Sequence, residues 1–228
     1  MPGMRAGIGR PADVTAGVPI GLPGEIPAPL LQLEWCAPFQ GIVRDALHAI
    51  KYSGEQRLAD PLGAAIARRW AHAGAGATLL THVPVHAERA RQRGYDQAEL
   101  IARSAARHLG LPHATLLVRA RATIAQFDLD RADRAQNVEN AFAVDDGRGA
   151  GGRGGGTSER RGRGVGTNDR PATSGRHGSG DVPAMIRGRW ILLIDDVVTT
   201  GATLAACAAA LQREGALGVS AITVARER

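Results

Sequence analysis

Apolar and polar positions recur along the chain with two periods, one typical of strands and one typical of helices. Residues 191–194 are four consecutive apolar side chains, as in a strand buried on both faces of a parallel sheet. The pattern predicts further strands at 77–85, 114–119, 141–144 and 219–226, and helices at about 42–50, 58–73, 96–109 and 204–214. Strands that alternate with helices predict an α/β fold with a central, mostly parallel sheet flanked by helices.

Two stretches lack this pattern. Residues 1–31 are rich in proline and glycine without a sustained period, and residues 147–180 are mainly glycine, arginine, serine and threonine. Neither can bury a core, so we expect a disordered N-terminal tail and a disordered Gly/Arg-rich insertion. One folded domain then comprises residues 32–146 and 181–228.

Charge and cysteine content narrow the class of protein. The net charge is +6, but residues 147–180 hold seven arginines and two acids, a balance of +5 that leaves +1 for the rest. The folded part is therefore close to neutral. Cys36 and Cys207 make neither a disulfide framework nor a complete zinc site. Without an apolar run near 18 residues or the hydrophobic core of a signal peptide, we expect a cytoplasmic protein with no membrane span.

A candidate sugar-phosphate site follows the apolar run at 191–194. Asp195 and Asp196 close the predicted strand, and their carboxylates can accept hydrogen bonds from sugar hydroxyls or hold Mg²⁺ directly or through water. The start of the next helix would offer free N–H groups to a phosphate. The small and hydroxyl residues leading into it are Val198, Thr199, Thr200, Gly201, Ala202 and Thr203. A P-loop is excluded because GxxxxGK[ST] is absent.

Basic residues follow the strand predicted at 77–85. Arg89, Arg91 and Arg93 fall in a predicted loop between this strand and the next helix. Ligands of open α/β sheets bind at the carboxyl ends of strands, and arginine binds phosphate oxygens in a bidentate fork, so these arginines predict a pyrophosphate site. Lys51 ends the first predicted helix and is either an anion ligand or a solvated residue; the sequence leaves both open.

A long polar segment without clear periodicity runs from residue 119 to residue 137. Because it is too long for an ordinary connection, we expect a mobile functional loop that can close over the site. The residues that we assign to this flexible loop are Arg119, Arg121, Thr123 and Gln126.

Residues 191–203 resemble, without a gap, the phosphoribosyl-pyrophosphate (PRPP) signature of type I phosphoribosyltransferases: four apolar residues, two acids, then a Thr/Gly-rich loop. Other blocks resemble the ComF (competence protein F) family, notably Lys51-Tyr52, Arg-Gly-Tyr-Asp-Gln-Ala at 93–98 and Arg-x-Arg-x-Thr-x-x-Gln at 119–126. The resemblance covers roughly 39–144 and 187–226 and implies the type I phosphoribosyltransferase fold. The family's cysteine-rich N-terminal zinc ribbon is not expected, because Cys36 is the only cysteine in that region.

The resemblance implies a Mg²⁺-dependent pentosyltransferase that displaces pyrophosphate from PRPP in favour of an acceptor that the sequence does not identify. It implies that Asp195 and Asp196 contact the ribose hydroxyls and that residues 198–203 wrap the 5′-phosphate. The implied cellular role is DNA uptake. A second hypothesis is a non-catalytic component that binds PRPP or single-stranded DNA. A competence helicase and a second copy of the chain are further candidate partners.

Overall fold

The computed structural model describes residues 26–119, 141–145 and 181–227. Most of the expected N-terminal tail, the whole Gly/Arg-rich insertion and the loop residues Arg121, Thr123 and Gln126 lie outside this range. Within it, no helix has the length and apolar character needed to cross a bilayer.

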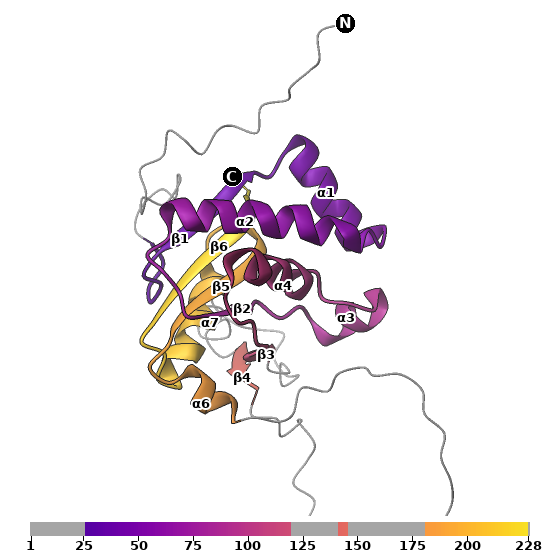
Figure 1. The fold of residues 1–228 in the computed structure, drawn as a ribbon. Helices are drawn as coiled ribbons and strands as arrows, with labels where there is room; N and C mark the ends of the chain where they lie inside the picture. Colours follow the sequence, from indigo (N-terminus) through magenta and orange to yellow (C-terminus); the bar gives the residue numbers. More distant parts are fainter. Residues whose placement is uncertain (1–25, 120–140, 146–180, 228) are drawn as a thin grey trace, which may run out of the picture.

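The core is a four-stranded parallel sheet (Figure 1). Its order is β1, β6, β5, β2, formed by Leu33–Pro38, Gly218–Arg226, Trp190–Val198 and Leu79–His82. Strand β5 lies inside the sheet, between β6 and β2, as its apolar run predicts. The expected α/β fold with a parallel sheet flanked by helices is therefore confirmed.

Helices cover one face of the sheet in a layer formed by α1 (Gly41–Tyr52), the short 3₁₀ turn η2 (Gln56–Leu58), α2 (Ala59–Ala73) and α4 (Gln97–Leu109). The side chains of Leu192 and Ile194 enter the core on this face. Ile191 and Leu193 enter a second core on the opposite face. Successive side chains of a strand point to opposite sides, so β5 supports both cores at once.

The opposite face is covered by α7 (Ala202–Arg213), the short α6 (Val182–Ile186) and an antiparallel pair, β3 (Leu117–Arg119) with β4 (Phe142–Val144). The residues predicted as strands at 114–119 and 141–144 thus pair with each other in a small separate sheet. Figure 1 shows this pair below the main sheet, on the side away from α1 and α2.

The first strand was not predicted from the sequence. The prediction placed the first core strand at 77–85, whereas β1 precedes it and pairs with β6. Its pattern is interrupted by Glu34, which is fully buried. Arg69 of α2 neutralises this carboxylate, with Nε and Nη2 at 3.1 and 2.5 Å from Oε2. A buried ion pair of this kind would cost about 3–5 kcal/mol if one partner were removed.

Two further differences concern chain segments near the site. The basic stretch expected as a loop contains a short helix, α3 (Ala87–Arg93), which ends at Gly94 in the left-handed conformation. Residues 26–31, placed in the tail by their proline content, pack on the domain: Leu30 is buried and the N–H of Leu31 donates to the carbonyl of Val219. The folded part therefore starts before the predicted boundary.

Candidate functional site

A small pocket lies at the carboxyl end of β5. Its lining is Asp195 and the stretch from Val197 through Leu204. Its volume is about 50 Å³, whereas a single water needs only about 10–15 Å³ by this measure, so the pocket has room for a group of several atoms. The predicted 5′-phosphate residues 198–203 all line this pocket.

The turn into α7 depends on Gly201. This residue has φ 81°, in the left-handed region, and serves as the N-cap of α7. A Cβ atom there would lie 2.9 Å from Cγ of Pro27, so both the turn and the close packing of residues 26–31 require glycine. The hydroxyl of Thr200 accepts a hydrogen bond from the N–H of Ala202 at 3.4 Å. The first residues of α7, Ala202 to Leu204, line the pocket, and the free N–H groups at the start of a helix suit an anion.

The two acids of the motif lie on opposite faces of β5. Asp195 lines the pocket on the α7 side, while the carboxylate of Asp196 meets α1 and α4 on the other side. Strand alternation dictates this division. The carboxyl of Asp195 accepts a hydrogen bond from the N–H of Asp196 at 2.8 Å. Burial, then the neighbouring Asp196 charge, raises the pKa of Asp195 well above its ordinary value. A bound cation or donor would favour its ionised form.

Asp196 is the centre of a polar cluster on the α1 side. Its Oδ2 lies 2.7 Å from Nζ of Lys51 and accepts a hydrogen bond from Nε2 of Gln97 at 3.0 Å. The Oε1 atom of Gln97 in turn accepts from Nη1 of Arg93 at 2.9 Å. Lys51 directly and Arg93 through Gln97 therefore bring two positive charges to Asp196, whose side chain is only 10% exposed. Lys51 is therefore not a solvated residue, because its side chain is largely buried and pairs with Asp196. Its role as a ligand of a bound anion stays a prediction.

The three arginines predicted for pyrophosphate differ in position. Arg89 and Arg91 are exposed on α3, where Nε of Arg91 donates to the carbonyl of Ala87 at 3.2 Å. Arg93 is half-buried at the end of the helix and is connected to Asp196 through Gln97. Only Arg93 of the three is tied to the acidic pair by a hydrogen-bonded chain in the described residues.

Arg119, which we assigned to the flexible loop, ends strand β3 instead. Its guanidinium carbon lies 4.9 Å from the centroid of the Phe142 ring. Burial lowers the pKa of Arg119, and the nearby Asp195 charge opposes that change. Within the described residues its Nε has no hydrogen-bond partner. Arg119 thus lies on the Asp195 side of the sheet as a half-buried cation that stacks on Phe142.

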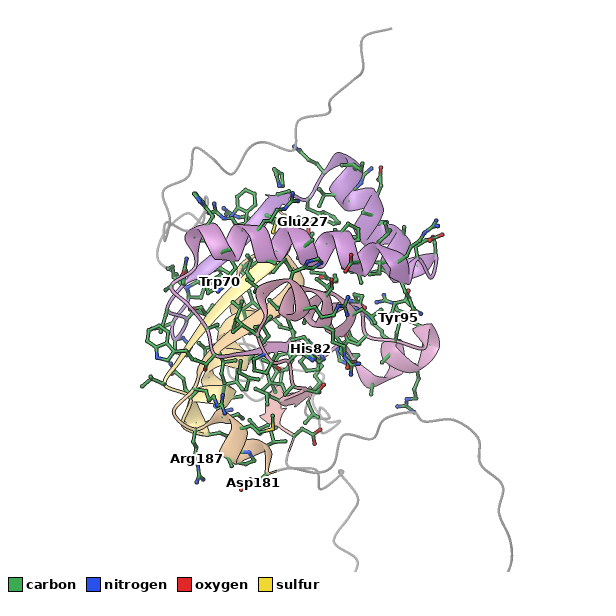
Figure 2. All side chains as sticks on the ribbon, in the orientation of Figure 1. Trp70, His82, Tyr95, Asp181, Arg187 and Glu227 are labelled. Atoms are coloured by element: carbon green, nitrogen blue, oxygen red, sulfur yellow. The ribbon has the colours of Figure 1, made fainter. Side chains whose placement is uncertain are left out.

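Asp96 fixes the chain between α3 and α4. Its Oδ1 accepts hydrogen bonds from the N–H groups of Ala98 and Glu99, which makes Asp96 the N-cap of α4, and its Oδ2 accepts from the N–H of Val85. His82, labelled in Figure 2, ends β2. Its Nε2 lies 3.9 Å from Oδ2 of Asp96. Nδ1 of His82 is 3.3 Å from Nε2 of His113. Burial lowers the pKa of His82 to about 4, so the ring is neutral at pH 7.

Neither thiol has the character of a nucleophile. Burial raises the pKa of Cys36 to about 12. Burial and the Asp195 charge raise the pKa of Cys207 well above its ordinary value. A protonated thiol is a poor nucleophile, so the chemistry of the pocket falls to oxygen and nitrogen groups.

Sequence reasoning missed Gln97 and Tyr95 as parts of the site. The hydroxyl of Tyr95 donates to the carbonyl of Ile50 and ties the end of α1 to the segment between α3 and α4, where Figure 2 labels it. Gln97 connects Arg93 to Asp196. Both residues come shortly after Arg93-Gly94. Their position next to the predicted pyrophosphate arginines was the sequence signal that could have indicated a place in the site. The pairing of His82 with His113 left no signal in the sequence.

No family model matches the sequence. The chain is 25% identical over 199 residues to the DNA utilization protein YhgH of Escherichia coli (strain K12), a match that covers 85% of this chain and 71% of that protein. It is 30% identical over 143 residues to competence protein F of Haemophilus influenzae, covering 62% of this chain and 46% of that protein.

Among solved structures, glutamine PRPP amidotransferase from B. subtilis matches with a TM-score of 0.41 and 17% identity, over 72% of this chain and 25% of that chain. A regulatory enzyme of purine biosynthesis matches with a TM-score of 0.39 and 16% identity, over 72% of this chain and 26% of that chain. This chain thus spans about a quarter of each of those two chains. The sequence relatives confirm the expected resemblance: the chain is similar to proteins named competence protein F and DNA utilization protein YhgH.

Proposed function

We propose that the chain binds Mg-PRPP and transfers its phosphoribosyl group to an acceptor, with release of pyrophosphate. The observation that carries the proposal is the pocket at the end of β5, where the Asp195 carboxyl and the hydroxyl-rich turn into α7 line one hollow. A carboxylate beside a helix N-terminus suits a sugar hydroxyl beside a phosphate. The names of the relatives support a cellular role in the uptake or use of DNA.

Each part of PRPP then has a matching group in the chain. The turn at 199–203 receives the 5′-phosphate, and the carboxylate of Asp195 accepts hydrogen bonds from the ribose hydroxyls. Lys51 and Arg93, both connected to Asp196, supply positive charge for the pyrophosphate. Asp196 acts through these cations, because its carboxylate faces α1 and α4 and not the pocket.

The transfer needs one bond to form and one to break. A lone pair of the acceptor forms a bond to the anomeric carbon, and the bond from that carbon to pyrophosphate breaks with its electron pair on the leaving oxygen. The acceptor's proton passes to solvent. The residues of this chain contribute by holding the sugar and by stabilising the charge of the leaving group.

Magnesium fits this site only together with the substrate. The described residues contain no group of three carboxylate, histidine or cysteine side chains suited to a metal, and Asp195 and Asp196 face opposite sides of the sheet. Mg²⁺ is usually held by one or two carboxylates plus substrate phosphates. Asp195 is the carboxylate available for that role, and the ion would neutralise part of the pyrophosphate charge.

Catalysis is tested by pyrophosphate release from Mg-PRPP in the presence of a panel of acceptors: purine bases, pyrimidine bases and ammonia. The proposal predicts release that depends on one class of acceptor and is lost in Asp195→Asn. PRPP binding with no release for any acceptor would contradict transferase activity.

A non-catalytic role is the second candidate, because the relatives are named for competence and DNA utilization rather than for a transfer reaction. Such a protein would bind PRPP or single-stranded DNA without turnover. Deleting residues 147–180, which lie outside the described structure, shows whether PRPP and single-stranded DNA are bound by different parts of the chain. Loss of DNA binding with PRPP binding retained would assign the DNA affinity to the Gly/Arg-rich insertion.

A further inference from the structure

A second and larger hollow lies in the helical layer, where α2 meets the end of α4 (Figure 1). Its volume is about 450 Å³, against about 50 Å³ for the pocket at β5. We call it the α2–α4 groove. Its lining residues are Pro61, Ala64, Ala67, Arg68, Ala71, His108 and Leu109. None of them lines the pocket at β5 or is an ion-pair or hydrogen-bond partner of Asp196.

The groove uses a side of α2 that the core does not use. The side chains of Leu62, Ile66 and Trp70 enter the core beneath the helical layer. The groove residues of α2 recur at helical spacing on the opposite side, and most of them are exposed or half-buried. They run from residue 61 to residue 71, a length of about 15 Å, or nearly three helical turns. The groove is therefore an elongated surface that remains after the core has formed.

The walls of the groove favour a helical occupant. Three of the seven lining residues are alanines, so a bound helix can approach to about 8 Å between axes, the short end of the usual range. The walls are the helices α2 and α4, whose inner backbone groups are already hydrogen-bonded within each helix. A bound strand would find no backbone partners there, whereas a helix satisfies its own.

Positive charge predominates beside the groove. Arg68 makes no hydrogen bond or ion pair with any residue that the structure describes. At the α4 end, Nη2 of Arg107 and Nε2 of His108 lie 3.2 and 3.3 Å from the same atom, Oδ1 of Asp60. This oxygen also accepts a hydrogen bond from Ser104 at 2.8 Å. Two arginines therefore face one carboxylate even while His108 is neutral, so acidic side chains on a partner would complement the surface.

We infer that the α2–α4 groove docks an acidic amphipathic helix of another protein. The apolar side of that helix fills the hollow above the alanines, and its flanking carboxylates meet Arg68 and Arg107. The inference does not depend on the proposed function, because α2 and α4 cover one face of the sheet and the pocket at β5 lies on the α7 side. A docked helix would leave that pocket uncovered.

Fluorescence anisotropy with two labelled synthetic peptides tests the inference on the full chain. Each peptide has about 16 residues, just over four helical turns, with leucine at every third or fourth position. The remaining positions are glutamate and alanine in the acidic peptide, and lysine and alanine in the basic peptide. The wild type should bind the acidic peptide saturably and roughly tenfold more tightly than the basic one, because juxtaposed like charges are unfavourable in an interface.

Three variants locate the binding surface. Arg68→Glu should bind the acidic peptide roughly tenfold more weakly and the basic peptide more tightly than the wild type does. Arg213→Glu is the matched control, because Arg213 is exposed at the end of α7, on the other face of the sheet, and it should bind both peptides as the wild type does. Ala64→Leu, which fills the hollow, should weaken the binding of both peptides. Circular dichroism checks that each variant is folded.

Several results would overturn the inference. They are no saturable binding of the acidic peptide up to about 1 mM, equal wild-type affinities for the two peptides, and an Arg68→Glu protein that binds the acidic peptide as the wild type does. An equal loss in Arg213→Glu would trace the preference to net charge alone.

Two further results would assign the groove to another occupant and would also overturn the inference. A wild-type dimer in sedimentation that Ala64→Leu converts to a monomer would assign it to a second copy of the chain. Saturable binding of anilinonaphthalene sulfonate that Arg68→Glu abolishes, without binding of the acidic peptide, would assign it to a small apolar anion.

Discussion

Nζ of Lys51 lies 2.7 Å from Oδ2 of Asp196, which joins the end of α1 to the second acid of the β5 motif. Both side chains are largely buried, with 19% and 10% of their surface exposed. The pair therefore does two things: it compensates a carboxylate inside the fold and it brings a cation to the site.

Lys51→Met should destabilise the protein, because it leaves the Asp196 carboxylate without its ionic partner. The cost is on the order of 3 kcal/mol, as for other buried pairs that lose one member. Urea unfolding at pH 7 measures it. Lys51→Arg keeps the positive charge, so its free energy of unfolding should fall much less. Equal stability of wild type and Lys51→Met would show that Gln97 alone is a sufficient partner.

Gly201→Ala should weaken phosphate binding as well as stability. The left-handed backbone costs a non-glycine residue about 1–2 kcal/mol, and the new Cβ would lie 2.9 Å from Pro27. Gly110→Ala is the matched control, because Gly110 has φ 67° with nothing within 4 Å of the added Cβ. Both variants should lose thermal stability, and only Gly201→Ala should lose affinity for ribose 5-phosphate. Loss of this affinity in both variants would contradict a specific role for the turn.

His82 should make the stability depend on pH between about 6.5 and about 4. Burial lowers its pKa from 6.5 to about 4, so in that window the unfolded chain binds a proton that the folded chain does not. Stability therefore falls as the pH is lowered, by about 1.4 kcal/mol per pH unit from this group. His82→Gln, which does not titrate, should flatten the slope in urea unfolding curves taken across the window. An unchanged slope would show that other groups cause it.

The strand–turn–helix around the acidic pair could be predicted because its local signals agree. The apolar run at 191–194 predicts a buried strand, and the small and hydroxyl residues at 198–203 predict the approach to a helix; both features are present. Strand alternation also predicts that Asp195 and Asp196 face opposite sides of the sheet, so the expectation that both contact the ribose did not use all of the local pattern.

Other features of the fold and of the candidate site could not be predicted from the sequence, because they depend on tertiary contacts. Strand β1 contains Glu34, and only the distant Arg69 makes this carboxylate acceptable in a core. The links from Asp196 to Lys51 and Gln97 join residues that are far apart in sequence, so no local pattern encodes them. Residues 26–31 pack on the domain through contacts such as Leu31 with Val219, which outweigh the proline content of the segment.

The central claim is that Asp195 lines a PRPP site, and a calorimetric titration of Asp195→Asn with Mg-PRPP tests it most directly. The folded-state pKa of Asp195 is raised, so the folded chain holds a proton that the unfolded chain has released, and stability falls with increasing pH until the folded group ionises. Asp195→Asn should therefore raise the melting temperature at neutral pH by a few degrees.

The same variant should bind Mg-PRPP at least tenfold more weakly than the wild type, an order-of-magnitude expectation for the loss of a charged hydrogen-bond acceptor. Asp45→Asn, on the exposed surface of α1, is the control for the change in net charge and should bind as the wild type does. A more stable Asp195→Asn protein with weakened PRPP binding is the predicted result. Wild-type affinity for Mg-PRPP in a folded Asp195→Asn protein would contradict the account.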